Sequence, residues 1–259
     1  MSRIKKAFEK DSAFIAFLTG GDPNIETTEK LIYAIEEAGA DLIEIGIPFS
    51  DPVAEGIVIQ SADERALAAG CTTDKLFEMV KKIRKNTDIA LVFMTYLNPI
   101  IVYGKDKFLS NCQASGIDGV IVPDMPFEEK EELSEECKRH NVDLISMIAP
   151  TSHERVEKIA SEATGFLYCV SSLGVTGVRS DIKSDAQEMI IHAKKFTSIP
   201  CAVGFGISTP EQVKKVSEYA DGVIVGSAIV KIIAEYGTKS IDPVKKYIQE
   251  VVEALRWQS

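Results

Sequence analysis

In the stretch Asp41-Leu-Ile-Glu-Ile-Gly-Ile47, a short apolar run after Asp41 surrounds one carboxylate, that of Glu44. Its centre, residues 42–45, lacks the regular polar and apolar alternation of a half-exposed strand. Apolar runs of this kind are typical of strands that are buried on both faces, as in a parallel sheet covered by helices. The stretch therefore predicts one buried strand of an α/β fold.

Seven further apolar runs of this kind are separated by segments with helical spacing. With the first, the predicted strands are 14–18, 42–45, 89–93, 119–122, 144–147, 166–170, 201–204 and 222–225. The predicted helices include 28–38, 74–85, 128–140, 152–160, 182–196, 210–217 and 242–257. Eight such repeats in 259 residues predict a single (β/α)8 TIM barrel over residues 1–259, with an extra N-terminal helix at 4–10. An open doubly wound sheet is the alternative, although no G-x-G-x-x-G motif follows the first strand.

The composition excludes several classes of function. The chain carries 29 Lys and Arg against 39 Asp and Glu, a net charge of −10, so nucleic acid and anionic membranes are poor partners. No apolar run is long enough to span a membrane, and the first residues lack the apolar core of a signal peptide. The five cysteines form no C-x-x-C pair, which argues against both a zinc site and a disulfide framework. We therefore expect a cytoplasmic protein without a metal.

Two glycine-rich turns follow the last two predicted strands. Gly204 and Gly206 come after the seventh strand, and Gly226 with Ser227 opens a helix after the eighth. In TIM barrels the site lies at the carboxyl ends of the strands, and these two loops commonly bind phosphate. Glycines allow backbone N–H groups to approach an oxyanion, and the start of a helix favours negative charge. The pattern predicts a phosphate site; the alternative is two tight turns with Ser227 as an N-cap.

Two glutamates of the second βα unit are candidate catalytic groups. Glu44 lies on an apolar strand at a position expected to face the barrel interior, where burial raises the pKa of a carboxyl group. Glu55 lies in the following loop, between Pro52 and Gly56. Together they could supply an acid and a base without histidine. The alternatives are a structural salt bridge or hydrogen bond for Glu44 and a solvated surface position for Glu55.

Other strand ends are expected to complete the pocket. Tyr168 could donate its hydroxyl into the pocket or belong to the core. The residues expected to line an apolar cavity, with plain core packing as the alternative, are Phe17, Met94 and Phe205. The loop 171–181 contains Gly174 and Gly177 and is predicted to form a mobile lid that excludes water from the site. The alternative is a long connection without function.

These segments resemble the tryptophan synthase alpha chain family. The likeness begins at Glu44-Ile-Gly-Ile-Pro-Phe-Ser-Asp-Pro-Val-Ala-Glu-Gly56 and continues at 17–23, 94–99, 123–126, 174–177, 204–208 and 226–230, in the family's order. The resemblance implies a lyase of tryptophan biosynthesis. Its reaction would be the retro-aldol cleavage of indole-3-glycerol phosphate to indole and D-glyceraldehyde 3-phosphate.

The resemblance also implies roles for the site residues. Glu44 would move the protons, Glu55 would accept the indole N–H, and Tyr168 would assist in positioning. The remaining implied substrate contacts are Phe17, Met94 and Phe205 around the indole, Thr176 on the lid, and Gly177, Gly206, Gly226 and Ser227 at the phosphate. Many members of the family have Asp where this chain has Glu55, so its carboxylate must sit farther back or its loop must shift.

A partner is implied as well. The family pattern predicts a PLP-dependent beta chain that condenses the indole with L-serine in an alpha2-beta2 tetramer, with PLP on the partner and no cofactor on this chain. Asp51, Pro52 and Asn98 are expected at that interface. Two other functions stay open at this point: a sugar-phosphate isomerase on the same barrel, and a weakly catalytic subunit that acts mainly as activator of the beta chain.

Overall fold

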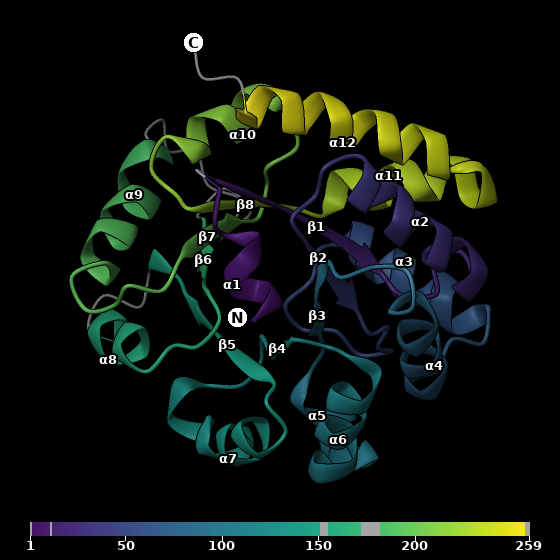
Figure 1. Cartoon of the computed structure of the whole chain (residues 1–259), viewed down its shortest axis with the longest axis horizontal. Helices are drawn as coiled ribbons and strands as arrows, with labels where there is room; N and C mark the ends of the chain where they lie inside the picture. Colours follow the sequence, from purple (N-terminus) through teal and green to yellow (C-terminus); the bar gives the residue numbers. More distant parts are fainter. Residues whose placement is uncertain (1, 11, 151–154, 172–181, 257–259) are drawn as a thin grey trace.

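Eight parallel strands close into a barrel in the computed structural model, which describes residues 2–10, 12–150, 155–171 and 182–256 (Figure 1). Each strand pairs with the next, and β1 pairs with β8 to close the sheet. The strands are β1 Ala13–Thr19, β2 Leu42–Gly46, β3 Ala90–Met94, β4 Gly119–Ile121, β5 Asp143–Ile148, β6 Leu167–Val170, β7 Cys201–Gly204 and β8 Gly222–Val225. The predicted TIM barrel is confirmed, and every predicted strand end agrees with the observed one to within one residue.

Helices surround the barrel, and a short one precedes it. They are α1 Arg3–Ala7, α2 Ile25–Glu37, α3 Ile57–Ala68, α4 Thr73–Ile83, α5 Leu97–Tyr103, α6 Lys105–Ser115, α7 Glu131–Arg139, α8 Val156–Ser161, α9 Ile182–Ala193, α10 Pro210–Ser217, α11 Ser227–Tyr236 and α12 Ile241–Arg256, with 3-10 turns η1 Phe127–Glu129 and η4 Gly237–Lys239. The predicted 128–140 helix starts late because the 3-10 turn η1 comes first. The N-terminal helix ends at Ala7 rather than at residue 10. Residues 152–154 and 257, which the sequence assigned to helices, lie outside the described part.

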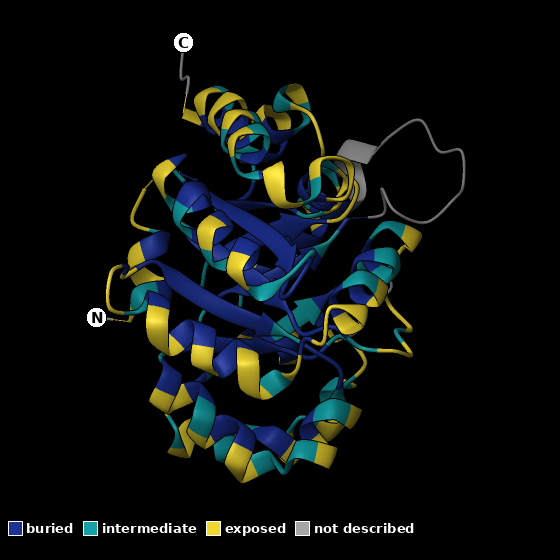
Figure 2. Cartoon of the chain, turned by 90° about the vertical axis from the view of Figure 1, so that its right-hand side faces the viewer, coloured by how far each residue is buried: buried dark blue, intermediate teal, exposed yellow. Residues whose placement is uncertain are grey.

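Strand residues alternate between two buried environments. The side chains facing the barrel interior form one cluster with α1: Ile4, Ala7, Ile15, Leu42, Ala90, Val92, Ile121, Ile145, Phe166, Tyr168, Ala202 and Ile224. Their neighbours along the strands pack outward under the helices. Figure 2 shows the result, with buried strands and helices that are exposed only on their outer faces. Since Glu44 follows Leu42 by two residues on β2, it shares the inward face.

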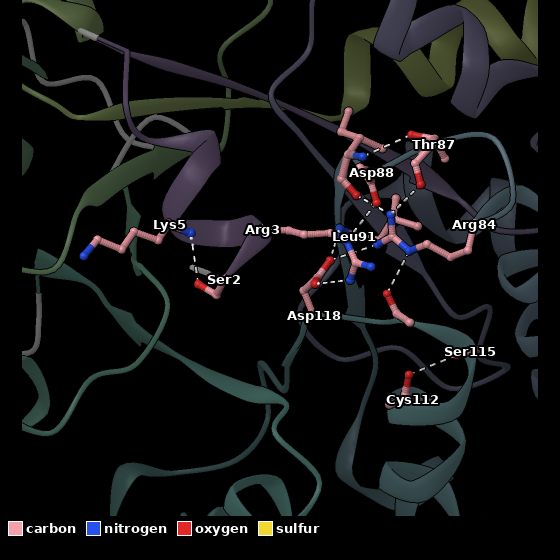
Figure 3. A network of polar contacts seen from close by, with 12 residues as sticks. Ser2, Arg3, Lys5, Arg84, Thr87, Asp88, Leu91, Cys112, Ser115 and Asp118 are labelled. Carbon is pink, nitrogen blue, oxygen red and sulfur yellow. Dashed lines mark hydrogen bonds and ion pairs between the residues drawn. The ribbon is translucent and has the colours of Figure 1, made fainter.

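The helix α1 covers one end of the barrel and lies across its axis in Figure 1. Its Ile4 is fully buried in the interior cluster. The neighbouring Arg3 donates from Nη1 to Asp118 Oδ1 at 3.0 Å, and Arg84 donates from Nη2 to Asp118 Oδ2 at 2.9 Å (Figure 3). The backbone N–H of Leu91 donates to the same Oδ2 at 2.9 Å. Asp118 therefore ties α1, the loop after α4 and the start of β3 together.

Removing the charge of Asp118 should destabilise the protein. Burial lowers the pKa of Arg84 to about 10, so this guanidinium depends on its carboxylate partner. We expect Asp118→Asn to reduce the free energy of unfolding by about 2–4 kcal/mol in urea titrations, because breaking a buried pair leaves a charge uncompensated. The control is Asp88→Asn, since Asp88 contacts Arg3 at 3.6 Å but its side chain is 86% exposed. Equal midpoints for the two variants would contradict the assignment.

Candidate active site

Glu44 lies near the middle of β2, on the inward face of the barrel. In the strand register it stands between Phe17 of β1 and Val92 of β3. The side chain is fully buried, and neither carboxyl oxygen has a hydrogen-bond partner among the described residues. Burial without compensation disfavours the carboxylate and raises the pKa of Glu44 to about 8. The group is therefore neutral at pH 7 and has the pKa that a general acid and base near neutrality needs.

Tyr168 faces the same interior from β6. Burial raises the pKa of its hydroxyl well above the usual value, and the charge of Glu44 adds to this shift. Its ring packs edge-on against Phe205, with centroids 6.1 Å apart. A Cβ at Gly204 would stand 2.3 Å from the Tyr168 hydroxyl, so the tyrosine fits only beside a glycine. The two rings are therefore in contact, while the pocket predicted for them from the sequence stays a prediction.

Phe205 has an unusual backbone conformation. Its φ of 76° lies in the left-handed region, which a bulky side chain rarely adopts. The Ser171 hydroxyl donates to the Phe205 carbonyl at 2.8 Å, and the Ser171 N–H donates to the Gly204 carbonyl. These bonds hold the turn against its strain. Strained residues of this kind cluster at ligand sites, which agrees with a role for the turn after β7.

Phe17 and Met94 form an apolar wall beside Glu44. They belong to one small cluster, in which Phe17 is 6% exposed. A Cβ at Gly46 would stand 2.9 Å from the Phe17 ring, and one at Gly226 would stand 3.2 Å from it. Both glycines therefore make room for this ring. The three residues predicted to line a cavity thus lie at the carboxyl ends of β1 and β3 and just after β7.

The helix α11 begins without a side-chain cap. Its N-cap is Gly226, and no side chain accepts from its first turn among the described residues. The preceding helix α10 differs, because Thr209 and Gln212 form a complete capping box there. Gly206 and Ser227 are exposed beside their strand ends, and Gly206 has a φ of 73°. An uncapped helix start beside a glycine turn is suited to an anion such as phosphate.

Glu55 lies half-buried in the loop between β2 and α3 and meets a second carboxyl group. The Asp63 carboxyl group on α3 and the Tyr96 hydroxyl are close enough to its side chain to affect its pKa. Burial raises the pKa of Glu55 despite these contacts. Burial and the nearby charge of Glu55 raise the pKa of Asp63 to about 8. Ionisation of either carboxyl group therefore disfavours ionisation of the other.

Asp63 and Tyr96 lie near Glu55 and were not among the residues predicted from the sequence. The signal for Asp63 was its place in the buried stripe of α3, among Ile59, Ala62 and Ala66. A carboxylate in such a stripe is as unusual as Glu44 on its strand. Tyr96 carries no comparable signal, because a buried tyrosine is most often a core residue.

The lid predicted at 171–181 falls almost entirely outside the described residues. Only Ser171 is described, so the positions of Thr176 and Gly177 remain sequence predictions. In the part of the chain that the structure covers, no group of three or more His, Cys, Asp or Glu side chains could hold a metal ion.

The predicted interface residues lie beside an exposed apolar surface. Asp51 and Asn98 are exposed and Pro52 is partly exposed, in the loop after β2 and on α5. Four exposed apolar side chains lie in that loop, at the start of α3 and on α5: Val53, Ile57, Ile101 and Val102. Val102 is the most exposed, at 79%. Large exposed apolar side chains close in sequence to these residues favour a surface that binds another protein.

The chain matches a family of known proteins over nearly its whole length. The family model described as tryptophan synthase alpha chain matches residues 3–256. The chain belongs to the tryptophan synthase alpha chain family. The tryptophan synthase alpha chain of Halalkalibacterium halodurans is 46% identical over 265 residues, covering 98% of this chain and 100% of the relative. That of a Thermoanaerobacter species is 46% identical over 262 residues, with the same coverage.

Solved structures of the family agree with the fold. The tryptophan synthase alpha subunit of Legionella pneumophila superposes with a TM-score of 0.89 at 37% identity, covering 98% of both chains. A structure of the tryptophan synthase α2β2 complex of Pyrococcus furiosus contains a chain that matches with a TM-score of 0.88 at 39% identity, covering 94% of this chain and 99% of that one. Membership of the tryptophan synthase alpha chain family confirms the resemblance and the lyase function predicted from the sequence, and it argues against the isomerase.

The buried acid should make stability depend on pH. Because the folded-state pKa of Glu44 is raised to about 8, the unfolded chain ionises first as the pH rises, and stability is lost between about pH 4.5 and 8. Glu44→Gln removes this loss, so the variant should gain stability relative to wild type over that range, reaching about 4 kcal/mol near pH 7.5. Urea titrations at several pH values measure the difference.

The matched control is Glu78→Gln on α4, whose side chain is exposed. Its effect on stability should be small, because its side chain is exposed. A stability difference for Glu44→Gln that does not change between pH 5 and 8 would refute the raised pKa.

Proposed function

We propose that Glu44 is the acid and base of the lyase reaction, the cleavage of indole-3-glycerol phosphate to indole and D-glyceraldehyde 3-phosphate. The observation that carries the proposal is a fully buried carboxyl group without a partner among the described residues, facing the interior near the carboxyl ends of the strands. A neutral acid in such a place can give a proton to the substrate and take one back.

The two proton transfers follow from the chemistry of the substrate. Neutral Glu44 gives its proton to carbon C3 of the indole, and the ring nitrogen supplies the electron pair that leaves the ring positively charged. The Glu44 carboxylate then takes the proton of the glycerol hydroxyl next to the scissile bond. As that C–C bond breaks, its electron pair returns to the ring and the hydroxyl carbon becomes the aldehyde. Glu44 ends protonated, as it began.

The other site residues take the roles that the family resemblance implies. The Glu55 carboxylate accepts the indole N–H and stabilises the positive charge that develops on the ring. Tyr168 positions the substrate next to Glu44. Apolar contact with the indole comes from Phe17, Met94 and Phe205, and backbone N–H groups at Gly206, Gly226 and Ser227 bind the phosphate. Thr176 and Gly177 complete this set as sequence predictions.

A beta chain is the proposed partner. The Pyrococcus furiosus relative is described as an α2β2 complex, and we extend that assembly to this chain as an alpha2-beta2 tetramer. The apolar surface of Val53, Ile57, Ile101 and Val102, with Asp51, Pro52 and Asn98 beside it, is the proposed contact. The partner would carry PLP and join indole to L-serine, while this chain needs no cofactor of its own for acid and base chemistry.

We also propose a cytoplasmic location and a single domain over residues 1–259. No helix in the described ranges is long and apolar enough to cross a membrane. The five cysteines are all free thiols and all buried, as suits a reducing compartment.

The role of Glu44 is tested by Glu44→Gln, which keeps the shape of the side chain and removes its proton chemistry. We expect indole release from indole-3-glycerol phosphate to fall by about 10²–10⁴-fold. Binding of glycerol 3-phosphate, measured by calorimetry, should stay nearly unchanged because the phosphate loops are untouched. Turnover at the wild-type rate would exclude Glu44 as the acid and base.

Glu55 separates the lyase from the activator alternative. Glu55→Ala should lower kcat by about 10²-fold, because a carboxylate that stabilises developing charge is lost, and Glu55→Asp should retain more activity. Indole release is assayed with and without a beta chain. If Glu55→Ala matches wild type in both conditions, Glu55 is a bystander; an inactive wild-type chain that still activates the beta chain would favour the activator.

A further inference from the structure

We propose that Asp63 is a positioning residue for Glu55: its neutral carboxyl group donates a hydrogen bond to the Glu55 carboxylate and directs it into the site. The inference rests on the proposed role of Glu55 and extends it to a residue on the neighbouring helix. Asp63 is 3% exposed, and its Oδ2 has no partner among the described donors. Oε2 of Glu55 is likewise buried and without a described donor.

The helix α3 holds the loop of Glu55 at two points. The Gln60 side chain donates from Nε2 to the Glu55 backbone carbonyl at 2.8 Å. Asp63 lies three residues farther along, on the same side of the helix, and meets the Glu55 side chain. A third support comes from Tyr96, whose hydroxyl accepts the backbone N–H of Ala54 at 3.1 Å. The backbone is therefore fixed by Gln60 and Tyr96, and the carboxylate itself is directed by Asp63.

The charges around the pair favour a shared proton over two carboxylates. Arg65, the nearest cation on α3, is bound by Asp22 through Nε at 2.9 Å and Nη2 at 2.7 Å. Within the described ranges, neither Glu55 nor Asp63 makes an ion pair with a Lys or Arg. Without a cation, one of the two carboxyl groups must stay protonated to avoid repulsion.

Asp63 is the member that keeps the proton. Its surroundings are the Glu55 carboxyl group, the Thr19 hydroxyl, the Phe49 backbone N–H and the Cys71 thiol. The hydroxyl and the N–H favour the ionised form, but burial and Glu55 outweigh them. Burial raises the pKa of the Cys71 thiol to about 11, so this neighbour is neutral as well. Asp63 therefore acts as a donor below about pH 8.

The contact with Asp63 also suits a glutamate at position 55, where many members of the family have the shorter aspartate. Glutamate has one more rotatable bond than aspartate, so its carboxylate needs an additional contact to stay in one orientation. Asp63 supplies that contact from a rigid helix. Above about pH 8 the donor is lost and the two carboxylates repel, which would turn Glu55 away from the substrate.

Three variants on α3 test the inference in the indole-releasing reaction of the full chain. Asp63→Ala removes the donor and should lower kcat by about tenfold at pH 7. Asp63→Asn keeps a donor that does not titrate, so kcat should stay within about threefold of wild type and should fall less steeply above pH 8. Glu64→Gln, at an exposed position of the same helix, should leave the rate and its pH dependence unchanged.

A purely structural Asp63 would not alter the pH profile. If Asp63→Asn falls with pH as steeply as wild type, or if Asp63→Ala is fully active, the inference is overturned. Thermal unfolding of each variant verifies that it is folded, and Asp63→Asn carries the test should Asp63→Ala fail to fold.

A measurement without turnover separates this inference from the role of Glu55. In protein labelled with ¹³C at the aspartate carboxyl carbons, the Asp63 signal is assigned by its absence in Asp63→Asn. We expect it to titrate near pH 8 and to move to lower pH in Glu55→Gln. Titration near the ordinary value of about 3.9 would overturn the pair. If Asp63 titrates as expected but Glu55→Ala is fully active, the pair exists and the proposed role of Glu55 is overturned. Asp63 would then have no role in catalysis.

Discussion

The proposed chemistry of this protein depends on the burial of one carboxyl group that has no described partner. Glu44 is neutral because water is kept from it, and that exclusion requires a complete barrel. The closed sheet supplies the walls, α1 covers one end, and Phe17 and Tyr168 occupy the space beside the acid. Any opening of the barrel would admit water and return Glu44 toward an ordinary glutamate. The fold thus sets the proton affinity of the proposed catalytic group.

The two ends of the barrel treat buried charge in opposite ways. At the end covered by α1, Arg84 and Asp118 are paired within 2.9 Å, and this contact joins separate segments of the chain. At the other end, Glu44 is left without a cation and Glu55 is matched with another acid. A buried charge that has an oppositely charged partner helps to hold the structure together, whereas a buried carboxyl group without a cation has a raised pKa. Both effects follow from the cost of removing a charge from water. This division agrees with the general separation of stability and activity in TIM barrels.

Much of this arrangement could be predicted from the sequence, because its signals are local. Strands buried on both faces produce short apolar runs, and an acid within such a run, as at Glu44, stands out without a structure. Three helices, α3, α5 and α6, were not predicted. Apolar residues such as Ile57 and Val102 are exposed on α3 and α5, so the apolar positions there do not mark the buried face of the helix. Asp63 was missed for a different reason. Its importance comes from a contact with a loop eight residues earlier, and sequence spacing does not show which way that loop turns.

The uncapped start of α11 has a consequence for how this protein can change over time. If the phosphate is bound by backbone N–H groups there, almost no side chain carries the affinity, and few single mutations can abolish it. The aromatic and acidic residues around Glu44 are, in contrast, open to substitution one at a time. Related proteins could therefore evolve to bind a different organic group while the phosphate stays bound at the same place. Proteins that keep this helix start would keep the ability to bind phosphate esters as a class, rather than one particular substrate.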